Sequence, residues 1–158
     1  MQKNTIQINF DVCTLDDLTA EERELVLAAR KATYTSYAPY SNFKVGAAIR
    51  LSNGQVVSGS NQENAAFGAG TCAERCALFY AHAQWPEEHV CAIAVAARGV
   101  NDDFLEQPIS PCGVCRQALI EAQTRAGQPV KALLVGKDAI YRVESVSHLL
   151  PFQFDAIV

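Results

Sequence analysis

The chain is 158 residues long and 49% hydrophobic, which suits one domain and leaves too little length for two ordinary ones. Its 13 lysines and arginines against 17 aspartates and glutamates give a formal charge of −4 and a pI of about 5.3, so we expect no nucleic-acid partner. The longest apolar run, residues 90–97, is far below the ~20 residues of a membrane span, and no basic segment followed by an apolar one opens the chain. We therefore expect a cytoplasmic protein with no membrane partner, folded as a single domain over residues 1–158 with a possible N-terminal extension over residues 1–15.

The first half of the chain predicts a helix followed by a β-hairpin. Residues 19–22 have the pattern of a threonine N-cap with an acidic first turn, and apolar residues then recur at helical spacing up to the stop at Pro39. Residues 45–51 and 56–60 flank an Asn-Gly pair, which is a strong signal for a hairpin turn. Residues 1–13 are expected to add one extended segment.

The second half alternates helices with short apolar strands. Residues 90–97 and 130–135 are suited to strands buried on both faces, and we expect them to be the central pair of the sheet. Helices are expected at about residues 72–84 and 112–126, while residues 140–158 carry no clear pattern. This order predicts an α/β fold, a three-layer α/β/α sandwich with a mixed central sheet of about five strands.

Three cysteines and one glutamate form the most informative pattern. Cys72, Cys112 and Cys115 could offer three thiolates to zinc, and three protein ligands leave a fourth position open for water, which is typical of catalytic zinc. Zinc lowers the pKa of such a water to about 7, and Glu74 could carry its protons from outside the coordination shell. With nothing that indicates export, the six cysteines are expected to be reduced thiols or metal ligands rather than disulfides.

Both cysteine clusters are expected where helices begin. Thr71 can serve as the N-cap before Cys72, and Ser110 can cap a helix that has Pro111 at its first position. The positive end of a helix dipole lowers the pKa of a thiol and so favours the thiolate. Three thiolates and an ionised glutamate around zinc would leave excess negative charge, and Arg75 is the candidate that balances it, with an ordinary solvated arginine as the alternative.

Each of these residues also has an alternative explanation. Cys112 and Cys115 alone could form a thioredoxin-like redox pair, although that leaves Cys72 unexplained. Glu74 could complete a capping box with the threonine three residues before it. Cys76, one turn after Cys72, could add a fourth thiolate and close a structural zinc site, which would indicate a zinc-stabilised binding module rather than an enzyme.

Four motifs carry a resemblance to a known family: PYSNFKVGAA at residues 39–48, GSNQENA at 59–65, TCAER at 71–75 and SPCGVCRQ at 110–117. On these motifs the chain resembles, over most of its length, the small, homotetrameric, zinc-dependent cytidine deaminases of the cytidine/deoxycytidylate deaminase superfamily. The resemblance implies hydrolytic deamination of cytidine and deoxycytidine to uridine and deoxyuridine, in pyrimidine salvage. It also implies a homotetramer that binds a small-molecule pyrimidine nucleoside.

The resemblance assigns the chemistry to four residues. Cys72, Cys112 and Cys115 would hold one Zn²⁺ per chain. Zinc-bound hydroxide would attack C4 of cytosine while Glu74 acts as the proton shuttle to N3 and to the departing ammonia.

The resemblance also implies five substrate contacts, from Phe43, Asn61, Glu63, Ala73 and Phe154. Asn61 and Glu63 would hold the ribose 3′-hydroxyl, with a polar turn after a strand as the alternative. Phe43 would pack against the nucleoside. Phe154 would stack on the base in a neighbouring subunit's site, with simple core packing as the alternative.

The chain departs from the family pattern at two positions: Cys76 takes the place of a threonine, and Phe67 that of a tyrosine. Neither change touches an expected zinc ligand. A close enzymatic alternative is a deaminase of another aminopyrimidine, such as a nucleoside antibiotic, but Asn61 and Glu63 favour a plain nucleoside.

Overall fold

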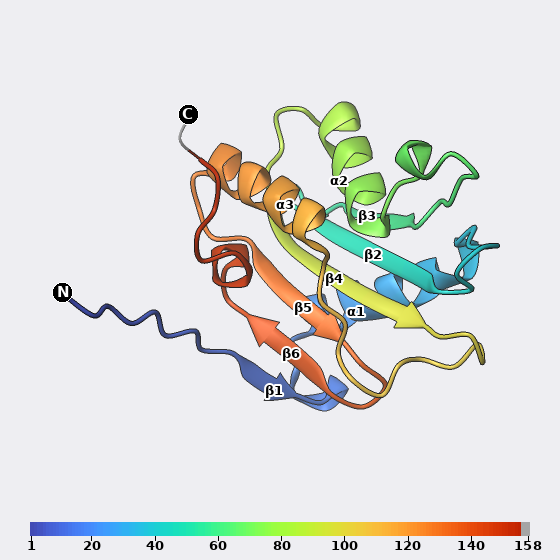
Figure 1. The fold of residues 1–158 in the computed structure, drawn as a ribbon, viewed down its shortest axis with the longest axis horizontal. Helices are drawn as coiled ribbons and strands as arrows, with labels where there is room; N and C mark the ends of the chain where they lie inside the picture. The colour runs from blue at the N-terminus through green and yellow to red at the C-terminus, as the bar shows by residue number, and fades with distance from the viewer. Residues whose placement is uncertain (156–158) are drawn as a thin grey trace.

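The computed structural model describes residues 1–155, and its centre is one mixed β-sheet (Figure 1). The strands lie in the order β1-β6-β5-β4-β2-β3. Their bounds are β1 (Asp11–Cys13), β2 (Lys44–Leu51), β3 (Val56–Ser60), β4 (Val90–Arg98), β5 (Lys131–Val135) and β6 (Ile140–Val143). The neighbours β4 and β5 run parallel at the centre of the sheet, as predicted, and the other four pairs are antiparallel. Strand β1 lies in the expected N-terminal extended segment, and among the described strands β6 is the one that the sequence did not predict.

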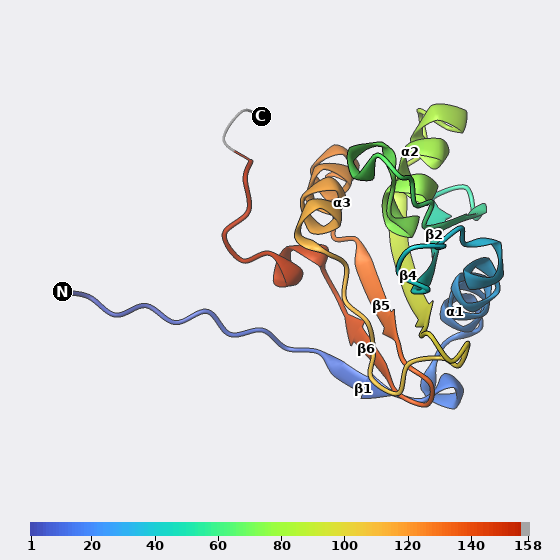
Figure 2. The same cartoon turned by 45° about the vertical axis from the view of Figure 1, so that its right-hand side comes forward.

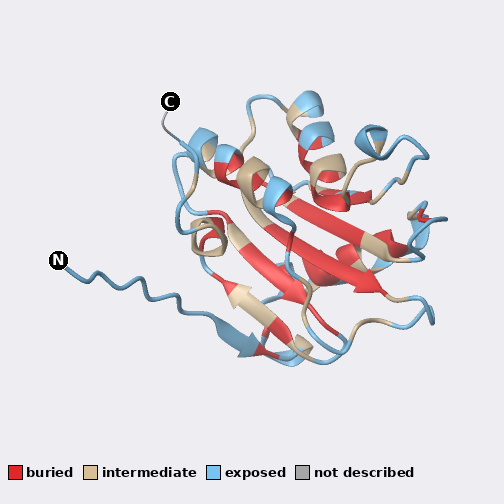
Figure 3. Ribbon diagram, in the orientation of Figure 1, coloured by how far each residue is buried: buried red, intermediate tan, exposed pale blue. Residues whose placement is uncertain are grey.

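Three helices cover the two faces of the sheet, which confirms the three-layer architecture (Figure 2). Helices α2 (Ala73–Gln84) and α3 (Gly113–Ala126) lie on one face, and α1 (Ala20–Ala32) lies on the other. Each face has its own apolar core, and the strands between the two cores are the most deeply buried elements (Figure 3). Among the described residues, no helix is long and apolar enough to span a membrane.

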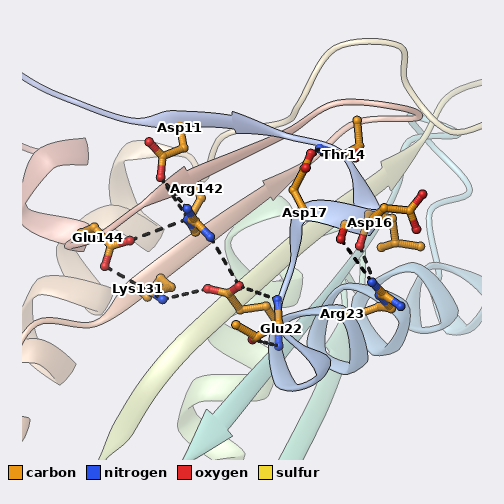
Figure 4. Close-up of polar contacts among 11 residues, drawn as sticks. Asp11, Thr14, Asp16, Asp17, Glu22, Arg23, Lys131, Arg142 and Glu144 are labelled. Atoms are coloured by element: carbon orange, nitrogen blue, oxygen red, sulfur yellow. Dashed lines mark hydrogen bonds and ion pairs between the residues drawn. The ribbon is translucent and has the colours of Figure 1, made fainter.

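The start of α1 is tied to the sheet by a buried glutamate (Figure 4). Thr19 is the N-cap, as predicted, and Glu22 completes a capping box in which each side chain accepts the other residue's backbone N–H. Its carboxylate also pairs with Lys131 at 2.7 Å, and Arg142 bridges it at 3.6 Å to Asp11 on β1, at 2.7 Å. Burial opposes the charge, yet the hydrogen bonds from Lys131 and Thr19 outweigh it and hold the pKa of Glu22 below its ordinary value.

Helix α2 sits directly on the hairpin strand β3 because residue 59 is glycine. A Cβ at Gly59 would lie 2.6 Å from the backbone nitrogen of Ala77 and 2.8 Å from the carbonyl oxygen of Ala73, closer than real contacts allow. The absence of a side chain therefore lets the helix backbone rest on the strand. This contact fixes how close the start of α2, which Cys72 caps, lies to the sheet.

The sequence of residues 140–158 shows no clear pattern, but the structure shows regular elements in the first part of this region. It contains β6, which pairs with β1 and β5, followed by a 3₁₀ turn at Val146–Leu149. Residues 150–155 then run without regular structure on the side of the molecule where α3 lies (Figure 2). The last part of the region 140–158, residues 156–158, lies outside the described residues.

Candidate active site

Three thiols from two helix starts meet at one point. The sulfur atoms of Cys72, Cys112 and Cys115 all lie within 4.8 Å of one another. Cys72 immediately precedes α2, Cys112 immediately precedes α3, and Cys115 follows in the first turn of α3. The prediction that both clusters lie where helices begin is confirmed.

The predicted N-caps are wrong by one or two residues. Cys72 and Cys112 themselves occupy the cap positions with extended backbone, rather than Thr71 and Ser110, and neither cysteine side chain makes a cap hydrogen bond. Thr71 remains outside the helix because its N–H donates to the carbonyl oxygen of Gln62 at 2.9 Å. The shift leaves the cap sulfurs free of backbone partners, so they can face a metal ion.

The spacing and charge of the thiols suit zinc. Two sulfurs bound to one zinc ion at about 2.3 Å in tetrahedral geometry lie about 3.8 Å apart. The Cys72 and Cys112 sulfurs lie 3.9 Å apart. Hydrogen bonding from Cys115, helped by Arg75 and Cys112 and opposed by burial, lowers the pKa of Cys72 to about 5. The same contact with the Cys72 thiolate, together with burial, raises the pKa of Cys115 above its ordinary value.

Arg75 lies beside the thiols rather than in open solvent. Its Nη2 approaches the Cys72 sulfur at 3.8 Å, and the side chain is half-buried. The contacts with Cys72 and Cys115 raise the pKa of the guanidinium, so it stays charged next to the sulfurs. A fixed positive charge here offsets the charge of a thiolate cluster.

Glu74 is buried at the second position of α2, with 4% of its surface exposed. The capping-box alternative is wrong, because Cys72 is the N-cap and Thr71 has already given its N–H to Gln62. Burial, and after it the charge of Cys72, raises the pKa of the Glu74 carboxyl above its ordinary value. A carboxyl whose pKa is raised by burial is better suited than an exposed one to take and give a proton in general acid–base catalysis.

Cys76 does not join the three-thiol cluster within the described residues. It lines a separate cavity of about 610 Å³ with residues of α1 and β3, and Cys72 is not among the residues that line that cavity. Because Cys76 lies outside the cluster, a saturated shell of four thiolates would require its sulfur to move toward the other three. The arrangement favours the open three-thiol site.

A pocket of about 470 Å³ opens beside the cluster and is large enough for a nucleoside. Cys72 and Arg75 line it, and so do Asn61 and Glu63. The aromatic ring of Phe67, 84% exposed, stands at its edge. The structure thus brings the expected ribose ligands to the same cavity as the thiols.

Asn61 has a structural task as well as a place in the pocket. Its Oδ1 accepts the N–H of Val45 at 2.8 Å, and its Nδ2 donates to the carbonyl oxygen of Phe43 at 2.9 Å. Ser36 donates a further hydrogen bond to Oδ1. One N–H of the amide remains for a ligand.

Glu63, which also lines the pocket, holds the turn at Tyr40 and Ser41. Its carboxylate accepts the N–H of Tyr40 at 2.9 Å and both the N–H and the hydroxyl of Ser41. The hydroxyl of Ser41 and then the N–H of Tyr40 lower the pKa of Glu63, so the group is an anion at neutral pH. A carboxylate offers about four acceptor positions, so one remains for a donor such as a ribose hydroxyl.

The other three expected substrate residues lie outside this pocket within residues 1–155. Phe43 is half-buried beside it, and Ala73 is buried as the first residue of α2. Phe154 is 63% exposed on the C-terminal segment, so the core-packing alternative is wrong.

Sequence reasoning missed several residues that build the site. Tyr40 and Ser41 orient Glu63, while Gln62 and Thr71 line the pocket and bridge the two segments that carry it. Gln117 contacts the segment that carries Phe154. All five belong to the four motifs, but a motif does not say which of its members contact a ligand and which hold the others in place.

Comparison with known proteins defines the class to which this fold and site belong. Residues 19–128 match the family described as the cytidine and deoxycytidylate deaminase zinc-binding region, which spans both thiol clusters. The match covers more than half of the chain. The chain belongs to the cytidine and deoxycytidylate deaminase family.

The individual proteins that the chain resembles are cytidine deaminases. The chain is 38% identical over 136 residues to a cytidine deaminase of Halalkalibacterium halodurans, an alignment that covers 86% of this chain and 96% of that protein. It superimposes on the crystal structure of a cytidine deaminase from Burkholderia pseudomallei with a TM-score of 0.71 and 41% identity, covering 87% of this chain and 100% of the other. A cytidine deaminase structure from Mycobacterium tuberculosis gives a TM-score of 0.67 and 29% identity, with 87% and 99% covered.

Proposed function

We propose that this chain is a zinc-dependent enzyme that hydrolytically deaminates cytidine and deoxycytidine to uridine and deoxyuridine. The observation that carries the proposal is the buried Glu74 beside three converging thiols, one of which, Cys72, lines a nucleoside-sized pocket. Neither a redox pair nor a binding module needs a buried carboxyl with a raised pKa at this point. Family membership and the named relatives agree with this reaction.

Each residue of the site would have its own part in the reaction. Cys72, Cys112 and Cys115 would hold one zinc ion per chain, and zinc, when bound, supplies a water that is acidic enough to react at neutral pH. Glu74 would take a proton from that water and deliver it to N3 of the pyrimidine. It would then take the remaining proton of the hydroxyl that the water leaves on C4 and pass it to the exocyclic amino group, which departs as ammonia. Arg75 would offset the charge of the thiolates.

The direct test is ultraviolet monitoring of the purified protein with cytidine, deoxycytidine, cytosine and adenosine. We expect turnover of the two pyrimidine nucleosides. We expect little turnover of cytosine, which lacks the ribose that Asn61 and Glu63 would bind, or of adenosine, whose base is a purine. Turnover confined to other aminopyrimidine compounds would assign a different deaminase. No turnover by zinc-loaded protein would overturn the proposal.

Glu63→Ala should lower kcat/KM for cytidine by roughly 5- to 150-fold, since an unmatched buried hydroxyl partner costs about 1–3 kcal/mol. Free cytosine, which lacks ribose, serves as the internal control and should be a poor substrate of both proteins. Glu87→Ala, at an exposed glutamate outside the pocket, is the matched control and should leave the kinetics unchanged. Equal loss on cytosine would mean that Glu63 only braces the turn.

Cys76→Ser should keep about one zinc ion per chain and most of the activity, because Cys76 lies in a different cavity from the cluster. Elemental analysis of the purified variant measures this directly. Loss of the metal would instead favour the four-thiolate binding module.

We also propose that the enzyme is a homotetramer in which Phe154 enters a neighbouring subunit's site. Its exposed ring, which lies outside the pocket of its own chain among the described residues, supports the proposal. Light scattering should give about four times 17.1 kDa, and a fully active monomer would contradict it. Pyrimidine salvage is the role we propose for the reaction, and the cytoplasmic location stays a prediction from the sequence.

A further inference from the structure

The side chain of Gln117 holds the backbone of Phe154 at two points. Its Nε2 donates to the carbonyl oxygen of Phe154 at 2.7 Å, and its Oε1 accepts the N–H of Phe154 at 3.2 Å. A carboxamide engaged at both ends offers the same pair of hydrogen bonds as a residue on an adjacent strand. The contact therefore fixes both the position and the orientation of this one backbone unit.

The residue before Gln117 anchors the same segment at its other end. Arg116 donates from Nη1 to the carbonyl oxygen of Leu149 at 2.7 Å and from Nε to that of Pro111 at 2.8 Å. Arg116 and Gln117 directly follow the thiol of Cys115 on α3. Two consecutive side chains thus tie the C-terminal segment to the helix that carries part of the thiol cluster.

Phe154 is fixed by its main chain while its ring stays in solvent. Phe154 is 63% exposed, and Phe152, two residues before it, is 89% exposed. An isolated chain gains no apolar burial by holding a phenylalanine in this way. The arrangement suits a ring that is presented to another surface.

We propose that Gln117 is a positioning residue for the deamination, which orients Phe154 so that its ring reaches the pyrimidine in a neighbouring copy's pocket. This inference rests on the proposed function, in which Phe154 is shared between subunits. Gln117 touches no reacting atom and acts only through Phe154. Stacking on the base is equal in the ground state and the transition state, so its loss raises KM and leaves kcat largely unchanged.

The test compares Gln117→Ala, Phe154→Ala and the double variant in cytidine kinetics. KM should rise about tenfold in each single variant, within the range that loss of base–aromatic stacking produces, with kcat within about twofold of the parent. The double variant should be no worse than Phe154→Ala alone, because the two residues act as one unit. Gln128→Ala, the same change at an exposed glutamine just beyond the other end of α3, should leave KM unchanged.

A second substitution of Gln117 tests the hydrogen bonds without shortening the side chain. Gln117→Glu can still accept the N–H of Phe154 but cannot donate to its carbonyl oxygen, and it sets a negative charge against that oxygen. Its KM should therefore rise as in Gln117→Ala, with zinc content and oligomeric mass unchanged. Loss of zinc in either variant would assign Gln117 to the metal centre and overturn the positioning role.

The shared site and the positioning role of Gln117 can be rejected by different results. Wild-type KM in Phe154→Ala would reject the shared site itself. Wild-type KM in Gln117→Ala beside an impaired Phe154→Ala would reject the positioning role alone. A double variant whose KM rises by the product of the two single effects would show that Gln117 acts by another route, and would also overturn the inference.

Discussion

Glu74→Gln should lower the rate of cytidine deamination by about 10²–10⁴-fold, the usual contribution of general acid–base catalysis. An amide cannot take a proton from an activated water or deliver one to the pyrimidine. Zinc content should stay at the parent level, because Glu74 is not one of the three clustered thiols. The melting temperature should stay equal or rise slightly, since the neutral amide removes a carboxyl whose ionisation burial disfavours.

Glu21 provides the matched control for this substitution. It occupies the second position of α1, as Glu74 does in α2, but it is exposed. Glu21→Gln should therefore change neither rate nor zinc content. Near-parental turnover by zinc-loaded Glu74→Gln would leave Glu74 with only a structural part.

Cys115→Ser should lose most of its zinc and reduce deamination to the background of the assay. Cys115 is fully buried where the starts of α2 and α3 meet. The serine hydroxyl of the variant is a weak zinc ligand, and within residues 1–155 no other side chain can take its place in the buried site. The melting temperature should also fall, because a metal held only by the folded state stabilises it. Cys91→Ser, at a half-buried thiol outside the cluster, should keep both metal and activity.

The parent protein gives a further check on the same site. Thiol ligands must lose their protons to bind zinc, so metal affinity should fall as the pH is lowered. Titration with a chelator at several pH values, followed by elemental analysis, measures the effect. Zinc retained by Cys115→Ser at full occupancy would exclude this cysteine as a ligand.

The sequence was sufficient for the layers of the fold because local signals agreed with the tertiary structure. The hairpin was placed by one Asn-Gly pair, and the central strands β4 and β5 by runs of apolar residues. The 3₁₀ turn and β6 were missed, since strands as short as Ile140–Val143 carry too few residues to show a period.

The site was predicted as a set of residues but not as an arrangement. Spacing grouped the three thiols, yet their caps were misplaced because Thr71 is held by a backbone bridge to Gln62 that no local pattern reveals. Asn61 was predicted as a substrate ligand, with a polar turn as the alternative, but its hydrogen bonds to the backbone at Phe43 and Val45 were not predicted. Such contacts join segments remote in sequence, so only the folded structure displays them.

The pairing of β1 with β6 has a consequence for how the chain reaches this structure. The ion pair between Asp11 and Arg142 joins residues 131 positions apart, so the strands it links close nearly the whole chain into one loop. Closing so long a loop is entropically costly before other contacts have formed. We therefore expect β1 to join the sheet late in folding, after the central strands and the helices that carry the thiols have assembled.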